Sequence, residues 1–270
     1  MQNAFHAEWR TTLRQKSSYI FVCLWTFVIT ILFLLERGLP QFEGYTNIVG
    51  TMINLMLYLL PLFMLIIGSL AITNEVEGGQ WSLLSTYPIS IFKYICGKFA
   101  GQLLAQIAIF TLSFGISILL SVILQFAISL KWLMLIYMFA IFLIIFFIGI
   151  GILIGSLSST RWQALMASVT VWFIFIMMWA SLLIAILLFV PYKLIATIMT
   201  VSLFFNPAEL LRVFFVTQFG GGAAFGKDYD GLISFIQTPF SLPLLLFYTI
   251  IYIWIIMLVA SGCMKRRQMN

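Results

Sequence analysis

Six long stretches without an acidic or basic residue set the strongest limit on how this chain can fold. About 20 apolar residues cross the roughly 30 Å hydrocarbon core of a bilayer as one helix, which satisfies its backbone hydrogen bonds internally. Apolar residues make up 63% of the chain and charged residues only 8%, which is outside the range of soluble domains. The sequence therefore predicts an all-α integral membrane protein. The six predicted spans are Ser18–Leu35, Met52–Ile72, Leu103–Phe126, Trp132–Ile154, Ala164–Val190 and Leu242–Ala260.

The lack of charge inside these spans also limits the chemistry of the chain. A charged residue at the centre of a spanning helix costs roughly 3 kcal/mol and usually marks an ion pathway, so coupling to a proton or ion gradient is disfavoured. An intramembrane protease or lipid transferase needs a nucleophile with a base, or paired carboxylates, at membrane depth. The predicted spans contain no His, Asp or Glu. We therefore expect no catalytic residue. We also expect no metal site, because methionines inside apolar helices are typical of packing.

The distribution of Lys and Arg predicts the orientation of the chain. Basic residues resist translocation, so cytoplasmic loops are enriched in them. With both termini in the cytoplasm, the inner segments hold nine basic residues and the outer segments five, three of which lie in one long loop. The inner residues are Arg10, Arg14, Lys16, Lys93, Lys98, Arg161, Lys265, Arg266 and Arg267. This asymmetry explains the formal net charge of +6, so no nucleic-acid partner is needed.

The chain reads as a single transmembrane domain over residues 1–270, with two atypical segments. In residues 1–17, Phe5, Trp9 and Leu13 recur every four residues beside a stripe of basic residues. This pattern predicts an interfacial helix along the inner leaflet. A basic flank that only anchors the first span is the alternative.

The second atypical segment is a long outer loop at residues 191–241. Asn206 and Pro207 have the types expected of a helix cap and a first helical residue, and Glu209 would lie in the positive first turn. A short helix from Pro207 to about Thr217 is predicted. This part of the loop, with Asn206, Pro207 and Glu209, is a candidate contact for an extracytoplasmic partner, or it caps the bundle.

The inner loop at residues 73–98 is the main candidate site. Gly78 and Gly79 can break the helix of the second span, and a short helix over Gln80–Thr86 would then end at Pro88. A new helix would start at Ser90. Such a short, stiff element between flexible glycines is suited to receiving force from a soluble partner. The candidate coupling residues are Glu75, Glu77, Gly79, Trp81, Leu84 and Pro88.

These residues carry a family resemblance. The pattern resembles the segment between the second and third spans of ABC-2 type permeases, the membrane subunits of one class of ATP-binding-cassette transporters. The matching residues are Glu75, Gly79, Leu83-Leu84, Pro88-Ile89-Ser90 and Gly97-Lys98. Within this class, Glu77-Gly78-Gly79, Thr86-Tyr87-Pro88 and Phe205-Asn206-Pro207-Ala208 resemble permeases of the nitrous oxide reductase maturation transporter. Gln80 departs from the broader pattern, which usually has threonine.

The resemblance implies a six-span permease in the bacterial cell membrane that works as a homodimer, in contact through the first and fifth spans, with a separate ATPase subunit. The chain has no G-x-x-x-x-G-K-[ST] phosphate loop, because Phe92 and Phe99 occupy the required glycine and hydroxyl positions around Lys98. No cofactor is expected on this chain, and ATP would bind to the partner subunit. The cargo implied is a sulfur species or copper, handled with an extracytoplasmic accessory protein.

Two other functions remain open from the residues alone. One is an ABC-2 exporter of a peptide antibiotic, lipid or drug. The other is a membrane anchor that recruits a soluble partner without transporting anything. The apolar spans contain no convergent polar cluster that would identify a cargo.

Overall fold

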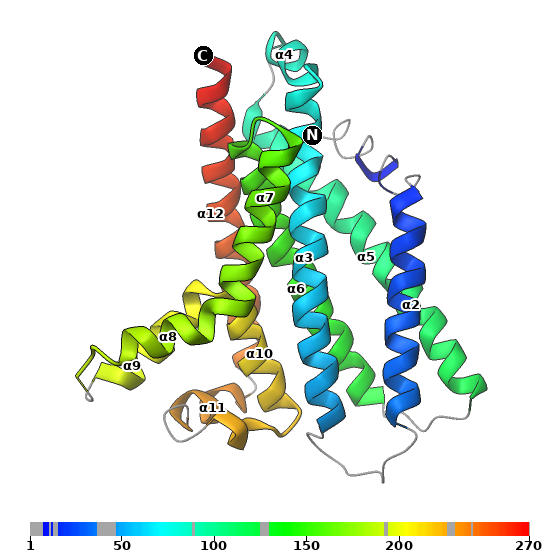
Figure 1. Cartoon of the computed structure of the whole chain (residues 1–270), viewed down its shortest axis with the longest axis vertical. Helices are drawn as coiled ribbons and strands as arrows, with labels where there is room; N and C mark the ends of the chain where they lie inside the picture. Colours follow the sequence, from blue (N-terminus) through cyan, green and yellow to red (C-terminus); the bar gives the residue numbers. More distant parts are fainter. Residues whose placement is uncertain are drawn as a thin grey trace.

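The computed structural model describes residues 8–10, 12, 16–36, 47–87, 90–124, 130–191, 194–225, 230–238 and 240–269. Helices running lengthwise form a bundle, with a cluster of short helices at one end (Figure 1). The elongated helices are α2 (Lys16–Glu36), α3 (Asn47–Glu77), α5 (Ile91–Ile123), α6 (Leu130–Leu157), α7 (Arg161–Trp172), its π-helical continuation η1 (Phe173–Met178), α8 (Trp179–Leu187) and α12 (Ser241–Met269). The shorter elements are α4 (Gln80–Ser85), α9 (Ile195–Phe205), α10 (Pro207–Gln218), η3 (Gly222–Phe225) and α11 (Asp230–Ile236).

The predicted spans coincide with these helices. Within the described residues, five helices are long and apolar enough to cross a membrane, and they carry the second to sixth predicted spans. The first predicted span lies in α2. Among the described residues, the apolar part of this helix is Tyr19–Ile31. The prediction of an all-helical membrane protein is confirmed. Most of the predicted interfacial helix at residues 1–17 lies outside the described residues; Glu8–Arg10 are helical.

The centre of the bundle is the close contact between α3 and α6. A Cβ atom added to Gly151 would lie 2.7 Å from the Leu65 carbonyl oxygen, and one added to Gly155 would lie 2.3 Å from that of Ser69. Only glycine allows two backbones to approach so closely. These glycines therefore allow α3 and α6 to pack closely, and the apolar core is built around this helix pair.

Two buried serines of α5, Ser113 and Ser117, donate hydrogen bonds to backbone oxygens. Ser117 donates a hydrogen bond to the Thr26 carbonyl of α2 over 3.3 Å, and Ser113 bonds back to Ile109 one turn earlier. The hydroxyl groups are thus satisfied by backbone oxygens, and the small side chains let the two helices pack closely. Thr111, on the same helix, is exposed, and its hydroxyl contacts that of Tyr137 on α6.

The predicted inner loop at residues 73–98 is mostly helical. α3 continues to Glu77, so Glu75 lies in its last turns, and α5 already begins at Ile91. The short helix, the break at Gly78-Gly79 and the new start after Ser90 are observed as predicted. Pro88 lies outside the described residues. The helices on both sides are longer than the apolar stretches because hydropathy marks the membrane-buried part of a helix and not its ends.

The predicted outer loop at residues 191–241 is also largely helical in its described part. α9 and α10 form an apolar pair bent by 112° at Asn206. α10 begins at Pro207 as predicted, with Asn206 accepting hydrogen bonds from the backbone N–H groups of Ala208 and Glu209. Most of α10 is buried against α6, α3 and α11. The segment therefore folds back onto the bundle instead of forming an open loop.

The fifth span is the least buried part of the bundle. None of the apolar window of Arg161–Leu187 is buried inside the described chain. α7 packs against α3, whereas α8 continues away from the bundle and mainly contacts η1 and α9 (Figure 1). The exposed side chains of α8 include Leu182, Ile184 and Ile186. This apolar surface must face lipid or another protein.

Candidate coupling site at the α4 end

The end of the bundle that carries α4 also carries the end of α12 and the described amino-terminal residues (Figure 1). We call it the α4 end. The turn into α4 depends on Gly79, which has a φ of 72°, a left-handed conformation that side chains other than glycine rarely adopt. Ser82 donates a hydrogen bond back to the Gly79 carbonyl over 2.6 Å. Gly79 therefore sets the angle at which α4 leaves α3.

Lys98 is the centre of a buried ionic cluster just below α4. Its side chain is 4% exposed, and its Nζ atom lies 2.8 Å from a carboxylate oxygen of Glu75 and 3.1 Å from one of Glu8. The same Nζ donates to the Ala71 carbonyl over 2.5 Å. The hydroxyl of Tyr94 donates to the other carboxylate oxygen of Glu75. The cluster connects the amino-terminal segment, α3 and α5 at one point.

α4 rests on this cluster through an aromatic contact. The Trp81 ring packs against Tyr94 with 5.6 Å between centroids, and Trp81 is only 5% exposed. We expected the segment to offer an indole and two carboxylates to a partner. The structure instead turns Trp81 and Glu75 inward, because each finds a buried partner on α5. Their predicted role in coupling would therefore act through internal contacts and not through direct docking.

Glu77 connects the α3 end to the loop between α6 and α7. One of its carboxylate oxygens accepts a hydrogen bond from the Arg161 backbone N–H over 2.7 Å and lies 3.5 Å from the Arg161 Nε atom. Arg267 near the end of α12 reaches the same loop, donating to the Ser158 carbonyl over 2.9 Å and to Ser159 Oγ over 3.1 Å. The ends of α3, α6, α7 and α12 are therefore joined by polar contacts.

The exposed side of α4 and of the turn after it carries two large apolar side chains among polar ones. Leu83 is 69% exposed and Tyr87 is 66% exposed, whereas Leu84 packs partly against the core. Trp162, next to Arg161 at the start of α7, is 72% exposed. Large apolar side chains at the end of a bundle, beside many charged groups, are typical of a protein contact surface. We call Leu83, Tyr87 and Trp162 the α4-end surface.

Sequence reasoning missed several residues of this site. Lys98 was noted as a basic residue and as part of the family pattern, and Arg161 only as a basic residue, whereas Tyr94 and Trp162 were not noted. The signal that could have identified Lys98 is its place on α5 five residues before the third predicted span, where a charged residue needs a partner. The partner itself could not be read from the sequence, because Glu8 and Glu75 lie on other segments.

The three residues expected at the opposite end do not form an exposed site. Asn206 and Pro207 are buried, and Glu209 is paired with Arg212 one turn later. Asn206 Nδ2 also donates to the Phe175 carbonyl of η1 over 2.6 Å. Its side chain therefore caps α10 and holds the α9–α10 corner to the π-helical part of the fifth span. Burial argues against direct contact of Asn206 or Pro207 with an outside partner; Glu209 stays a prediction.

Replacing Asn206 by alanine is expected to lower the free energy of unfolding by about 2–4 kcal/mol, because it removes a helix cap and a buried hydrogen bond to Phe175. Asn206→Ser keeps a capping oxygen but is too short to reach Phe175, so it should lose about half as much. The midpoint of thermal unfolding of the purified protein measures both. An unchanged midpoint for Asn206→Ala would show that the corner does not depend on this side chain.

Comparisons with known proteins agree with the architecture. Residues 2–261 match the model of the ABC-2 family transporter proteins. The chain is 26% identical over 234 residues to a protein of Stutzerimonas stutzeri named probable ABC transporter permease protein NosY, covering 83% of both chains. It is 28% identical over 219 residues to a protein of the same name from Pseudomonas aeruginosa, covering 75% of this chain and 79% of that one.

Proposed function

The chain belongs to the ABC-2 transporter family and is the permease subunit of an ABC transporter in the cell membrane, and from this premise we propose that it exports a sulfur species or copper for the maturation of nitrous oxide reductase. The proposal is supported by the likeness to two NosY permeases over most of the chain. It is also supported by the match at Glu77-Gly78-Gly79 and Phe205-Asn206-Pro207-Ala208, which surround the two helix breaks of this structure.

The α4-end surface is the proposed contact for the ATPase subunit. The observation that carries this assignment is that Leu83 of α4 and Tyr87 just after it are exposed, while Trp81 on the other side of α4 packs against Tyr94 beside the Lys98 cluster. A push on the exposed face is therefore passed to α3 and α5 through buried contacts. Glu77 would pass the same movement to α7 through Arg161.

The proposed orientation places the α4 end in the cytoplasm. The described basic residues concentrate at this end, on the first turns of α5, the start of α7 and the end of α12. Positive charge near the ends of spanning helices favours the cytoplasmic side. Both chain termini would then be cytoplasmic, and the α9–α10 corner would face the outside, where an accessory protein could meet it.

We further propose that two copies of the permease pair through the fifth span. The apolar surface of α7, η1 and α8 is exposed in the single chain, and α8 receives little support from the rest of the bundle. A second copy would bury this surface. The first span also has an exposed apolar side, with Tyr19, Ile20 and Phe27 each about two-thirds exposed.

Changing Leu83 to aspartate is expected to weaken the ATPase complex about tenfold or more, since a charge at the centre of an apolar contact removes a principal source of affinity. The fold should be unaffected because Leu83 is mostly exposed. The measurements are the amount of ATPase that copurifies with the permease and the copper content of nitrous oxide reductase in the same cells.

The matched control is Leu83→Met, which keeps the apolar contact and should keep both values. Normal ATPase binding by Leu83→Asp would contradict the docking assignment. Normal copper content in a strain that lacks this permease would contradict the proposed cargo and would favour export of a peptide antibiotic, lipid or drug. Loss of ATPase binding with no transported cargo would favour the anchor function.

A further inference from the structure

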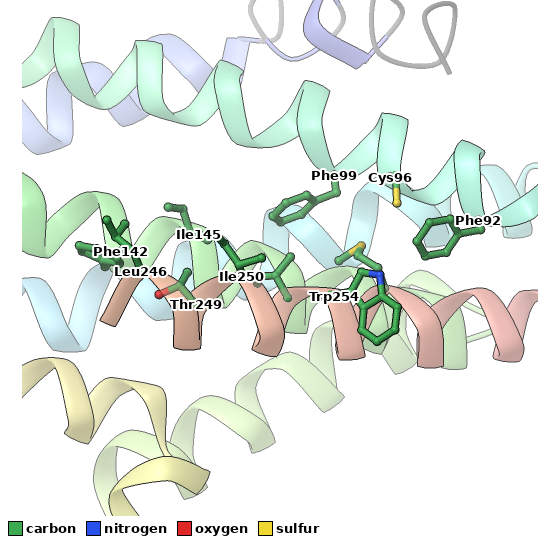
Figure 2. A pocket seen from close by; sticks show the side chains of 11 residues that line it. Phe92, Cys96, Phe99, Phe142, Ile145, Leu246, Thr249, Ile250 and Trp254 are labelled. Atoms are coloured by element: carbon green, nitrogen blue, oxygen red, sulfur yellow. The ribbon is translucent and has the colours of Figure 1, made fainter. Parts of the chain in front are cut away.

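A groove between α5 and α12 runs through two neighbouring cavities of different chemistry. The cavity farther from the α4 end, which we call the deep cavity, has a volume of about 400 Å³ and is bordered by α5, α6 and α12 (Figure 2). Figure 2 shows Phe92, Cys96 and Phe99 on the α5 side and Leu246, Ile250 and Trp254 on the α12 side. Almost the whole lining is apolar. This cavity can accept a hydrocarbon chain but offers little to a polar cargo.

The second cavity continues the groove toward the α4 end. Its volume is also about 400 Å³, and the two cavities share Phe92. The lining here is half polar, with Ser90, Ser261 and Lys265 among its residues. The lining also includes the first turn of α5. Ser90 precedes this turn, and its hydroxyl accepts no hydrogen bond from the backbone N–H groups there. The groove therefore changes along its length from apolar to polar and positively charged.

The deep cavity is about as long as one acyl chain of a bilayer lipid. Along α12 it extends from Leu246 to Met257, which at 1.5 Å per residue is about 17 Å. Half of a hydrocarbon core of about 30 Å is roughly 15 Å. The polar cavity begins at Leu258, the next residue. Lys265 then lies about two helical turns farther along α12, near the height of lipid headgroups.

We propose that this groove is a binding site for an anionic phospholipid of the leaflet at the α4 end, with an acyl chain in the deep cavity and the phosphate beside Lys265. Charge complementarity selects this occupant, because basic pockets between spanning helices recognise anionic headgroups. An uncharged lipid would gain the apolar contact but not the contact with Lys265. The lipid would join α12 to α5, the helix that carries the Lys98 cluster.

Brominated lipids give a direct test. The full-length protein is placed in nanodiscs of phosphatidylcholine that contain increasing fractions of phosphatidylglycerol with dibrominated acyl chains, and tryptophan fluorescence is measured. The difference between the wild type and Trp254→Phe isolates quenching at the groove. We expect this difference to saturate at a lower fraction of brominated phosphatidylglycerol than of brominated phosphatidylcholine.

Three variants test the role of the polar cavity. Lys265→Gln should raise the half-saturating fraction of phosphatidylglycerol about fivefold, because this is the contribution of one basic residue to binding near an anionic surface. Gly262→Leu should also weaken binding, because nothing lies within 4 Å of a Cβ added there and the larger side chain would fill part of the polar cavity. Arg266→Gln removes the same charge from the next residue, which does not line the cavity, and should leave the value unchanged.

Two outcomes would overturn the proposal. Equal saturation by the two brominated lipids would show that the groove takes bilayer lipid without selecting its headgroup. Quenching that does not depend on Trp254 at any lipid fraction would show that another part of the protein, or a second copy, fills the groove. Neither result depends on whether the protein transports the proposed cargo.

Discussion

Replacing Lys98 by methionine is expected to destabilise the protein by about 3–5 kcal/mol, the largest effect of any single charge removal in the described chain. Lys98 is the common partner of Glu75 and Glu8 and is almost fully buried. Without it, two largely buried carboxylates would face each other with no cation between them. Breaking a buried ion pair in this way costs more than the pair contributes, because an uncompensated charge stays buried.

The effect can be measured as the free energy of unfolding in a detergent titration and as the amount of folded protein in the membrane. The triple variant Lys98→Met, Glu75→Gln, Glu8→Gln should recover most of the loss because no unpaired charge is left. Arg161→Met is the matched control. It removes the partner of Glu77, an exposed ion pair, and should cost less than about 1 kcal/mol.

A result in which Lys98→Met and Arg161→Met have equal small effects would contradict the buried cluster. This comparison also bears on how coupling residues should be tested. Loss of function after a change at Glu75 would combine loss of folding with loss of coupling, whereas Glu77 can be changed with little effect on folding. The two carboxylates therefore need separate experiments.

Gly155→Ala is also expected to destabilise the protein strongly, by about 3 kcal/mol, at the upper end of the range for over-packed cores. The added Cβ would lie 2.3 Å from the Ser69 carbonyl oxygen and 3.1 Å from Ile72 Cβ. The obstructing oxygen belongs to the backbone of α3, so it cannot rotate away as a side chain could. The two helices would have to separate along their contact.

Gly115→Ala is the matched control for this prediction. It also replaces a glycine inside an apolar helix, but the structure shows nothing within 4 Å of the added Cβ. Alanine should stabilise α5 there by up to about 1 kcal/mol through its higher helix propensity. The midpoint of thermal unfolding of the purified protein compares the two. A stabilising effect of alanine at both positions would contradict the close contact of α3 and α6.

The features that the sequence predicts well depend on neighbouring residues. The break at Gly78-Gly79 and the helix that begins at Pro207 follow from the conformational limits of glycine and proline, which act within a few residues. The apolar spans follow from hydropathy over about 20 residues. The outer segment was predicted less well, since Ile195–Phe205 is too short to mark a span by itself and its bent pairing with α10 depends on packing.

Membrane insertion, the six apolar stretches and the short helix α4 were determined by the sequence alone, because the energies involved are local: burial of apolar side chains in lipid and the backbone preferences of a few residues. Only the tertiary structure decided that Glu75 and Trp81 face inward, that Lys98 joins three segments, and that α5 and α12 enclose a groove. These features depend on side chains far apart in the chain meeting at the same depth, which is set by how closely the helices pack.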